Sequence, residues 1–186
     1  GLGNLRRLSA AEVREHEPGH ADQPVHVRVQ HDALVVLGGL VEGIPSEREP
    51  GAIREGLRYV WMFDVREPGN PVSIATFPQP SEADYCAKGG SFGPHNLHEN
   101  RPGAFQSSRL VFATYYNAGV RAYDIENPFQ PREVGFYVPP NPTRMMDPRP
   151  NRPQVIQSCD CYVDRNGLLY LTDPNAGLNI LQFKGA

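Results

Sequence analysis

Cysteine is scarce in this sequence of 186 residues, and an excess of positive charge and long hydrophobic runs are both absent. Three cysteines, Cys86, Cys159 and Cys161, are too few for a disulfide scaffold, and the odd number leaves at least one thiol without an internal partner. The net charge of −3 and the lack of lysine or arginine clusters argue against a nucleic-acid partner. No stretch approaches roughly eighteen consecutive apolar residues, so we expect no membrane span.

Several catalytic motifs are missing as well. The sequence has no Gly-x-Ser-x-Gly, no glycine-rich phosphate loop, no His-Glu-x-x-His and no pair of Cys-x-x-Cys motifs. Serine hydrolase, nucleotide-binding and zinc-ribbon functions are therefore disfavoured. No secretory signal is visible, although Gly1 is not a natural start and a leader could already have been removed. We expect a soluble protein and assign it no location.

Proline and glycine, by contrast, are abundant, with 19 and 18 residues. Short apolar runs separate them, a pattern that favours many short strands and turns over disorder. The chain is long enough for one sizeable core or for part of a larger repeat fold.

An internal repeat organises the sequence. VWMFDVREPGNPVSIATF (60–77) and VRAYDIENPFQPREVGFY (120–137) align from end to end without a gap. Their shared frame is aromatic-Asp-x-x-x-Pro-x-x-Pro, followed by a branched aliphatic and an aromatic residue. The frame predicts a strand that ends at Asp64 or Asp124, whose side chain bonds to backbone amides of the turn. The prolines interrupt the ladder before a second strand begins.

A third copy is partial, because only NAGLNILQF (175–183) remains to match NAGVRAYDI (117–125). Two further strand-like runs precede each copy, so each unit has four short strands and the last stops after three. Tandem four-stranded units are typical of β-propeller blades. We therefore predict an all-β fold, a β-propeller of four-stranded antiparallel blades with about three blades in an incomplete ring. The alternative is two similar hairpins in an ordinary β-sandwich.

The phrases GVRAYDIENPFQPREVGFY and LLYLTDPNAGLNILQF resemble the LVIVD-repeat family of propellers, over roughly residues 24–183. The units here exceed the family's length of about forty residues because they carry insertions. Three blades do not close a ring. The chain is then a fragment, or a second chain carries the other blades, or copies of this chain complete one another.

These units divide the chain into four parts. Residues 1–23 form an N-terminal segment with a short helix, in which Ser9 and Glu12 make a capping box. A first blade covers 24–78 with an insertion at 39–57, and a second covers 79–138 and opens with a connection at 79–94. Residues 139–186 hold a Pro-rich connection and a partial blade that lacks its fourth strand. The helical segment is a poor candidate for that strand.

Nearly all the extra length lies in 2-to-3 loops and blade-to-blade connections, which emerge on one face of a propeller. Insertions on one face usually build a binding surface. The alternative is that these loops only pack against missing blades.

Potential metal ligands recur where the first strand of each unit begins. Val25-His26-Val27, His95-Asn96-Leu97 and Cys159-Asp160-Cys161 come into register there. Imidazoles that converge on one axis suit a transition metal such as Fe, Cu, Mn or Zn. The expected metal ligands, in order, are His26, His95, His98 and Asp160.

Other residues have secondary roles in this hypothesis. Glu99 can orient an imidazole, and Tyr115 can line a pocket at the end of a second strand, so these are the catalytic candidates. For Tyr115 the alternative is aromatic packing between blades. The thiols of Cys159 and Cys161 face one side of a strand, where soft-metal ligation, a bond to Cys86 or buried packing all remain open.

Two functions from different classes follow. The first is part of a propeller metalloenzyme with a mononuclear site on the axis, acting on a small molecule by oxidation, lyase or hydrolytic chemistry. It is similar in layout to the selenium-binding protein/methanethiol oxidase group and the carotenoid cleavage oxygenases, an analogy of architecture alone. The alternative is a non-catalytic scaffold for a protein or glycan partner. In both, a second chain or copy supplies the remaining blades.

Overall fold

The computed structural model describes residues 5–7, 34–39, 59–147, 150 and 152–184. His26, the predicted helix near Ser9 and residues 40–57 of the predicted insertion lie outside the described residues. Within that part of the chain the fold is all-β, which confirms the predicted class. The α-helix that is described there is short, α2 (Glu82–Tyr85), and is followed by the 3-10 turn η1 (Cys86–Lys88).

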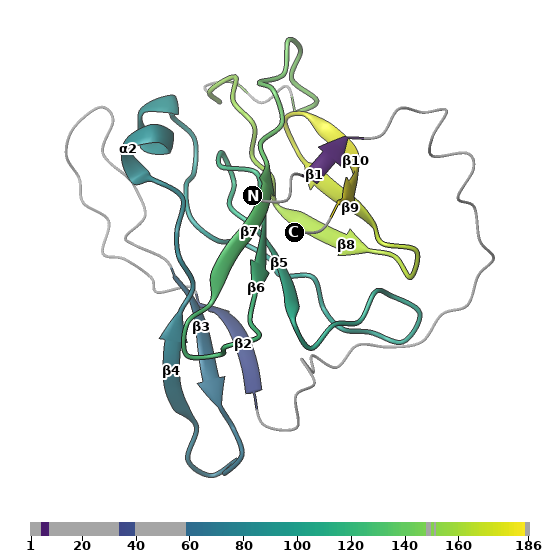
Figure 1. Ribbon diagram of the computed structural model, residues 1–186. Helices are drawn as coiled ribbons and strands as arrows, with labels where there is room; N and C mark the ends of the chain where they lie inside the picture. The colour runs from purple at the N-terminus through teal and green to yellow at the C-terminus, as the bar shows by residue number, and fades with distance from the viewer. Residues whose placement is uncertain (1–4, 8–33, 40–58, 148–149, 151, 185–186) are drawn as a thin grey trace.

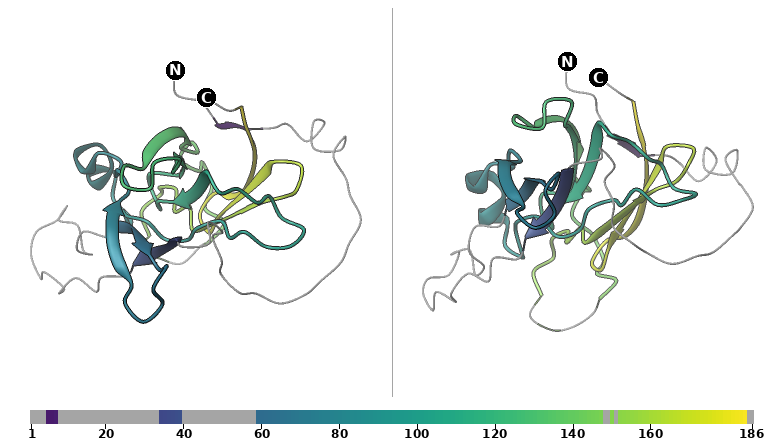
Figure 2. Two further views of the ribbon diagram at one scale, coloured as in Figure 1. Left: turned by 60° about the horizontal axis from the view of Figure 1, so that its bottom comes forward. Right: turned by 90° about the horizontal axis from the view of Figure 1, so that it is seen from below.

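Three small antiparallel sheets make up the fold. The first sheet has the order β2-β3-β4, and the middle sheet has the order β5-β6-β7. The last sheet has the order β1-β10-β9-β8. The middle sheet lies between the other two in every view (Figures 1 and 2). The strands are β1 (Leu5–Arg7), β2 (Leu34–Gly39), β3 (Tyr59–Asp64), β4 (Val72–Thr76), β5 (Leu110–Thr114), β6 (Val120–Asp124), β7 (Arg132–Tyr137), β8 (Asp160–Val163), β9 (Leu168–Asp173) and β10 (Gly177–Phe183).

The sequence repeat is also a repeat of backbone geometry. The pairing of β3 with β4 shifts register between Met62 and Phe63, and the pairing of β6 with β7 shifts between Ala122 and Tyr123. These two irregularities fall at aligned positions of the two sequence copies. A β-bulge at a fixed place in two sheets reflects a shared local design, because the extra residue sets how the strand bends and twists.

One face of the middle sheet packs against the first sheet. Strands expose alternate residues to opposite faces, and this alternation divides the core into two clusters. The first cluster joins Val60 and Met62 of β3 to Val111 and Ala113 of β5, together with Tyr123 of β6. All five side chains are buried.

The opposite face of the middle sheet packs against the last sheet. Phe112, Val120 and Ala122 meet a set of buried residues from β8, β9 and β10. That set is Cys161, Val163, Leu169, Leu171 and Leu181. Because both of its faces are covered, every residue of β6 is buried.

The middle and last sheets each gain a further segment along one edge. Residues 95–98 run along β5 and bond to it, for example through His98 N–H and the Phe112 carbonyl oxygen at 2.9 Å. In the last sheet, β1 lies antiparallel to β10, with Leu5 opposite Phe183 and Arg7 opposite Leu181. The fourth strand expected to be missing from the last unit is therefore supplied by N-terminal residues that precede the predicted helix.

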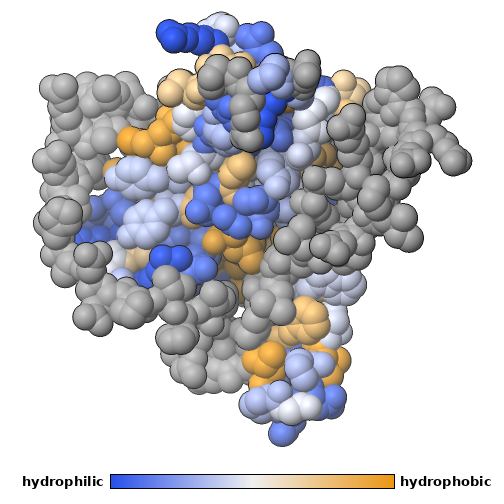
Figure 3. All heavy atoms as spheres, turned by 180° about the vertical axis from the view of Figure 1, so that it is seen from behind, coloured by the Kyte–Doolittle hydropathy of each residue, from blue (hydrophilic) through white to orange (hydrophobic). Residues whose placement is uncertain are grey.

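The first sheet is covered on one face only among the described residues. Tyr59, Trp61 and Phe63 form a row of neighbouring rings on β3, with centroids 6.3 and 6.5 Å apart, and all three are half-buried. Hydrophobic side chains are visible on the protruding hairpin of β3 and β4 (Figure 3).

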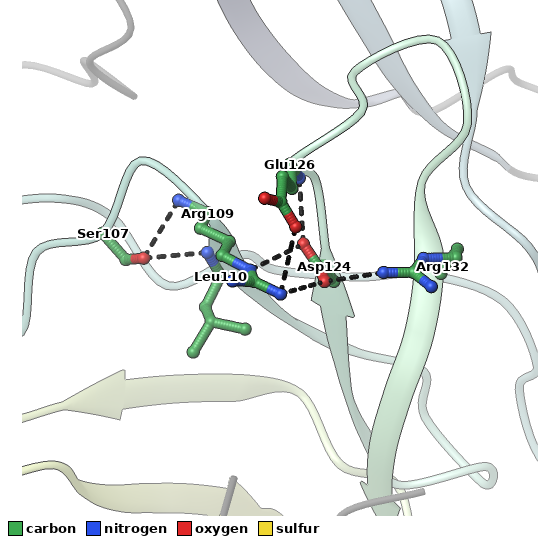
Figure 4. A network of polar contacts seen from close by, with 6 residues as sticks. All are labelled: Ser107, Arg109, Leu110, Asp124, Glu126 and Arg132. Atoms are coloured by element: carbon green, nitrogen blue, oxygen red, sulfur yellow. Dashed lines mark hydrogen bonds and ion pairs between the residues drawn. The ribbon is translucent and has the colours of Figure 1, made fainter. Parts of the chain in front are cut away.

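The predicted turn after each aspartate is present. Arg66 N–H donates to Asp64 Oδ1 at 3.0 Å, and Glu126 N–H donates to Asp124 Oδ1 at 2.9 Å. Both carboxylates thus satisfy a backbone donor that the strand ladder leaves free, which confirms the prediction. Around Asp124 two arginines add further bonds, Arg109 from the turn before β5 and Arg132 from the start of β7 (Figure 4).

Candidate functional site

The described connections are held at one end of the sheets by two equivalent asparagines. Asn117 Nδ2 donates to the carbonyl oxygens of Tyr85 at 2.8 Å and Gly89 at 2.9 Å. Asn175, at the aligned position of the next copy, donates in the same way to the Val155 carbonyl oxygen at 2.7 Å. Both asparagines are buried. Each anchors the connection that leads into its own unit to the turn between the unit's second and third strands.

The two connections are also bonded to each other. Ser91 N–H donates to Gln157 Oε1 at 3.0 Å, and Gln157 Nε2 returns a bond to the Ser91 carbonyl oxygen at 3.3 Å. Gly90 lies beneath this contact with φ +76°, and a Cβ built there would lie 2.6 Å from Gln157 Nε2 and 2.9 Å from Val155 Cγ1. The close approach therefore requires glycine. The two described connections are therefore joined to each other at this end of the molecule.

The first strands of the middle and last units begin at this surface, in the register that the sequence suggested. His95 N–H donates to the Thr114 carbonyl oxygen at 2.9 Å, and Cys159 N–H donates to the Thr172 carbonyl oxygen at 3.0 Å. Thr114 and Thr172 are aligned with each other in the repeat. His95 and Cys159 therefore occupy equivalent positions in neighbouring sheets.

His95 and Cys159 are in direct contact. His95 Nδ1 lies 2.6 Å from the Cys159 carbonyl oxygen, which also accepts a bond from Thr114 Oγ1 at 2.8 Å. A carbonyl oxygen only accepts, so Nδ1 carries the hydrogen. In the neutral ring Nε2 is then the acceptor, on a side chain that is exposed. Such a backbone contact to one ring nitrogen is typical of histidines whose other nitrogen binds a metal.

Tyr116 packs beside this imidazole. The two ring centroids are 4.7 Å apart. Tyr116 has φ +42°, which is the left-handed region that bulky residues rarely adopt. Its backbone N–H and carbonyl oxygen both bond to Ser158, at 3.0 and 2.9 Å. These bonds hold the strained conformation, and they place an aromatic ring against His95.

His98 is a structural residue. Its Nδ1 accepts the Val163 N–H at 3.1 Å, and its Nε2 donates to the Phe105 carbonyl oxygen at 2.9 Å. The side chain is 8% exposed, and burial lowers its pKa. Both nitrogens of the neutral ring are therefore occupied by backbone groups of the middle and last units. The prediction of His98 as a metal ligand is not supported by this geometry.

The remaining predicted site residues are dispersed. Glu99 accepts a bond from Arg101 Nε at 2.7 Å. Asp160 is exposed, follows Cys159 in the chain, and accepts the N–H of Cys161 at 2.8 Å. Tyr115 is fully buried in the first core cluster, and burial raises its pKa to about 12. Its position favours the packing interpretation over a catalytic role.

The cysteines are all free thiols. Cys161 is buried in the second core cluster, where desolvation raises its pKa strongly. Cys159 donates from Sγ to the Gln157 carbonyl oxygen at 3.0 Å, and burial raises its pKa to about 11. Thiols held in this protonated form behave as small packing residues. Of the three alternatives for the Cys-x-Cys segment, packing fits best.

The described residues contain no group of three or more His, Cys, Asp or Glu side chains that could hold a metal ion. A protein site for a transition metal takes three or four such ligands. The described residues alone therefore do not form the expected centre, and His95 is the predicted ligand whose geometry fits one. Within the same part of the chain, no helix has the length and apolar character needed to cross a membrane.

Asn117, Asn175 and Gln157 order this surface, and sequence reasoning did not single them out. The signal was available for the asparagines, because Asn-Ala-Gly occurs in both aligned copies. Gln157 carries no comparable signal. Comparison with known proteins adds no assignment: no family model, no curated protein and no solved structure matches this chain.

Proposed function

We propose that the three sheets are consecutive blades of a β-propeller of the LVIVD-repeat type. Three observations support this. The bulge recurs at a fixed place in two sheets, neighbouring sheets pack face to face, and the first strands of neighbouring units meet at His95 and Cys159. In a propeller, strands at this position border the central channel. The end that carries His95 is then the end where the connections gather.

We propose, further, that this end holds a metal-dependent site for a small molecule, to which His95 contributes Nε2. The observation that carries the proposal is the bond from His95 Nδ1 to the Cys159 carbonyl oxygen, which fixes the tautomer and leaves Nε2 as the acceptor on an exposed side chain. The further ligands come from outside the described residues, with His26 as the candidate in this chain, or from a second chain or copy.

The described residues have definite tasks in such a site. The Cys159 carbonyl oxygen and the Tyr116 ring orient the imidazole, and Thr114 fixes that carbonyl. The two connections, which are bonded to each other through Ser91 and Gln157, lie at the same end of the sheets as His95. A bound Fe, Cu, Mn or Zn ion would supply a Lewis acid or a redox centre.

Metal analysis of the purified protein and its His95→Ala variant tests this proposal. The wild type should contain stoichiometric metal, and His95→Ala should lose most of it with an unchanged circular dichroism spectrum. His98→Gln is the matched control, because it replaces a nearby histidine that has no free nitrogen. It should keep the metal at a lower stability. A wild type that binds no supplied transition metal overturns the proposal.

A second candidate is the non-catalytic scaffold, favoured by the mutual bonding of the connections through Ser91, Gln157, Asn117 and Asn175. A surface tied together in this way loses little conformational entropy when a protein or glycan binds. If this function is correct, a double Asn117→Ala, Asn175→Ala variant loses partner binding and His95→Ala keeps it. If the metal-dependent function is correct, His95→Ala abolishes the function and the double asparagine variant reduces it less.

A further inference from the structure

Each of the two outer faces of the sheet stack carries hydrophobic side chains that are exposed or only half-buried. We propose that a second copy of this chain packs head-to-tail on them, last sheet against first sheet at both contacts, and closes a ring of six sheets. The inference rests on the proposed propeller arrangement.

These two contacts use equivalent positions. In the first contact, Val60 and Met62 of β3 face the middle sheet. In the second, Val120 and Ala122 of β6 face the last sheet, and these are the aligned positions of the next copy. Each sheet therefore presents one fixed face, which we call the leading face, to the sheet that follows it.

The opposite side of each contact is equivalent too. The middle sheet receives the first sheet with Val111 and Tyr123. The last sheet receives the middle sheet with Leu169 and Leu181, again the aligned positions of the following copy. We call this side the receiving face. Both described contacts therefore pair a leading face with a receiving face, at aligned positions of the copies.

The last sheet has a leading face that meets no further sheet among the described residues. Leu178 and Ile180 occupy the positions of Val120 and Ala122, and Tyr170 occupies that of Phe112. Tyr162, Tyr170 and Ile180 lie opposite one another across β8, β9 and β10, on the face that carries Leu178. Leu178 is 53% exposed and Tyr162 is 43% exposed. The counterpart of Leu178 in the middle sheet, Val120, is buried.

The first sheet offers the matching receiving face. Phe63 occupies the position of Tyr123, and Trp61 and Tyr59 continue the row along the same side of β3. These three rings are half-buried, whereas Tyr123 and its other counterpart, Leu181, are fully buried. The partially exposed aromatic row is thus a receiving face on which no sheet packs among the described residues.

The number of copies follows from closure. The two faces differ, so the contact is head-to-tail, and such contacts give rings when the rotation closes. Propellers typically have about four to eight blades. Two copies of three sheets give six, whereas three copies exceed that range. A second copy also fits because it repeats contacts that the chain already makes internally.

Measuring the molecular mass of the full 186-residue chain in solution tests the proposal. Light scattering coupled to size exclusion should give the mass of two chains at micromolar concentration. Leu178→Glu on the leading face and Trp61→Glu on the receiving face should each weaken the dimer by at least about tenfold. Phe129→Glu is the control, because Phe129 is 68% exposed in the turn between β6 and β7 and belongs to neither face. It should remain dimeric.

Mixing the two variants distinguishes this geometry from others. One intact leading face and one intact receiving face then coexist, so a one-to-one complex of Leu178→Glu with Trp61→Glu should form where neither variant self-associates. A dimer that pairs leading face with leading face would ignore Trp61→Glu and give no rescue. That result, or a monomeric wild type, or a larger ring, overturns the proposal. The readout is independent of metal content, so the metal site and the ring can fail separately.

Discussion

The first and middle sheets share one sequence frame and one backbone design, and yet they differ in what surrounds them. The bulge lies at equivalent residues, and the turn after the aspartate uses the same backbone bond. Every residue of β6 is buried, whereas β3 alternates between buried and half-buried residues. The local sequence therefore specifies bulge and turn, and the neighbouring sheets specify burial.

The turns after Asp64 and Asp124 also share a local bond and differ in their surroundings. Asp64 is bonded by Arg66 from its own turn, and its side chain is 18% exposed. Asp124 is 4% exposed and is bonded by Arg109 and Arg132, which come from two other places in the middle unit (Figure 4). These two arginines hold the pKa of Asp124 down to about 2. The shared frame predicts the turn after each aspartate. Residues that differ between the two copies decide how strongly the carboxylate is stabilised by ion pairs.

The largest difference should appear when equivalent core positions are truncated. Tyr123→Ala should lower the free energy of unfolding by about 3–5 kcal/mol, because it empties a buried site against Phe77, whose ring centroid is 5.0 Å away. Phe63→Ala should cost about half as much or less under dilute, monomeric conditions, since that ring is half-buried. Urea denaturation followed by circular dichroism measures both. Equal losses would mean that the first sheet is as fully packed as the middle one.

The corner aspartates should differ next. Asp124→Asn should cost about 1–3 kcal/mol, because it removes the acceptor charge from a buried site bonded by two arginines. Asp64→Asn should cost less, since its ion pair with Arg66 is exposed to solvent. Urea denaturation at pH 7.5 measures both losses, and an equal cost at the two corners would contradict this ranking.

The Asp124 pKa also predicts an acid response. Its folded-state pKa of about 2 lies below the usual 3.8, so its contribution is complete above about pH 4 and is lost as the pH falls towards 2. Unfolding curves of wild type and Asp124→Asn should converge over that range. Curves that stay parallel down to pH 2 would show that the arginines do not stabilise the carboxylate.

Much of the backbone could be predicted because repeated residues report on local structure. The all-β class, the turn at each aspartate and the register of His95 with Cys159 follow from alternation, proline placement and the alignment of the copies. The Asn-Ala-Gly turns belong to this group as well, since each places an amide beside its connection.

Other features depend on contacts that no local pattern reveals. β1 consists of Leu-Arg-Arg, which has no strand alternation, and it is a strand because the edge of β10 accepts it. His95 and His98 look alike in GPHNLHEN, yet His98 is occupied by Phe105 and by Val163, which is distant in the sequence. Tyr115 sits beside Tyr116 in sequence, but the alternation of the strand turns it into the core between the first and middle sheets.

The smallest predicted effect concerns His98, a buried histidine of the middle unit. Burial lowers its folded-state pKa below the usual 6.5, so the folded protein holds fewer protons there than the unfolded chain does. Its contribution to stability is therefore complete above about pH 6.5 and declines as the pH falls below that value. Urea midpoints should fall between pH 7.5 and pH 5 for wild type, by an amount that His98→Gln reduces, although the variant is less stable at pH 7.5. An identical decline in both proteins would assign the acid sensitivity to other groups. His98 would then cause no difference between the first and middle sheets in this pH range.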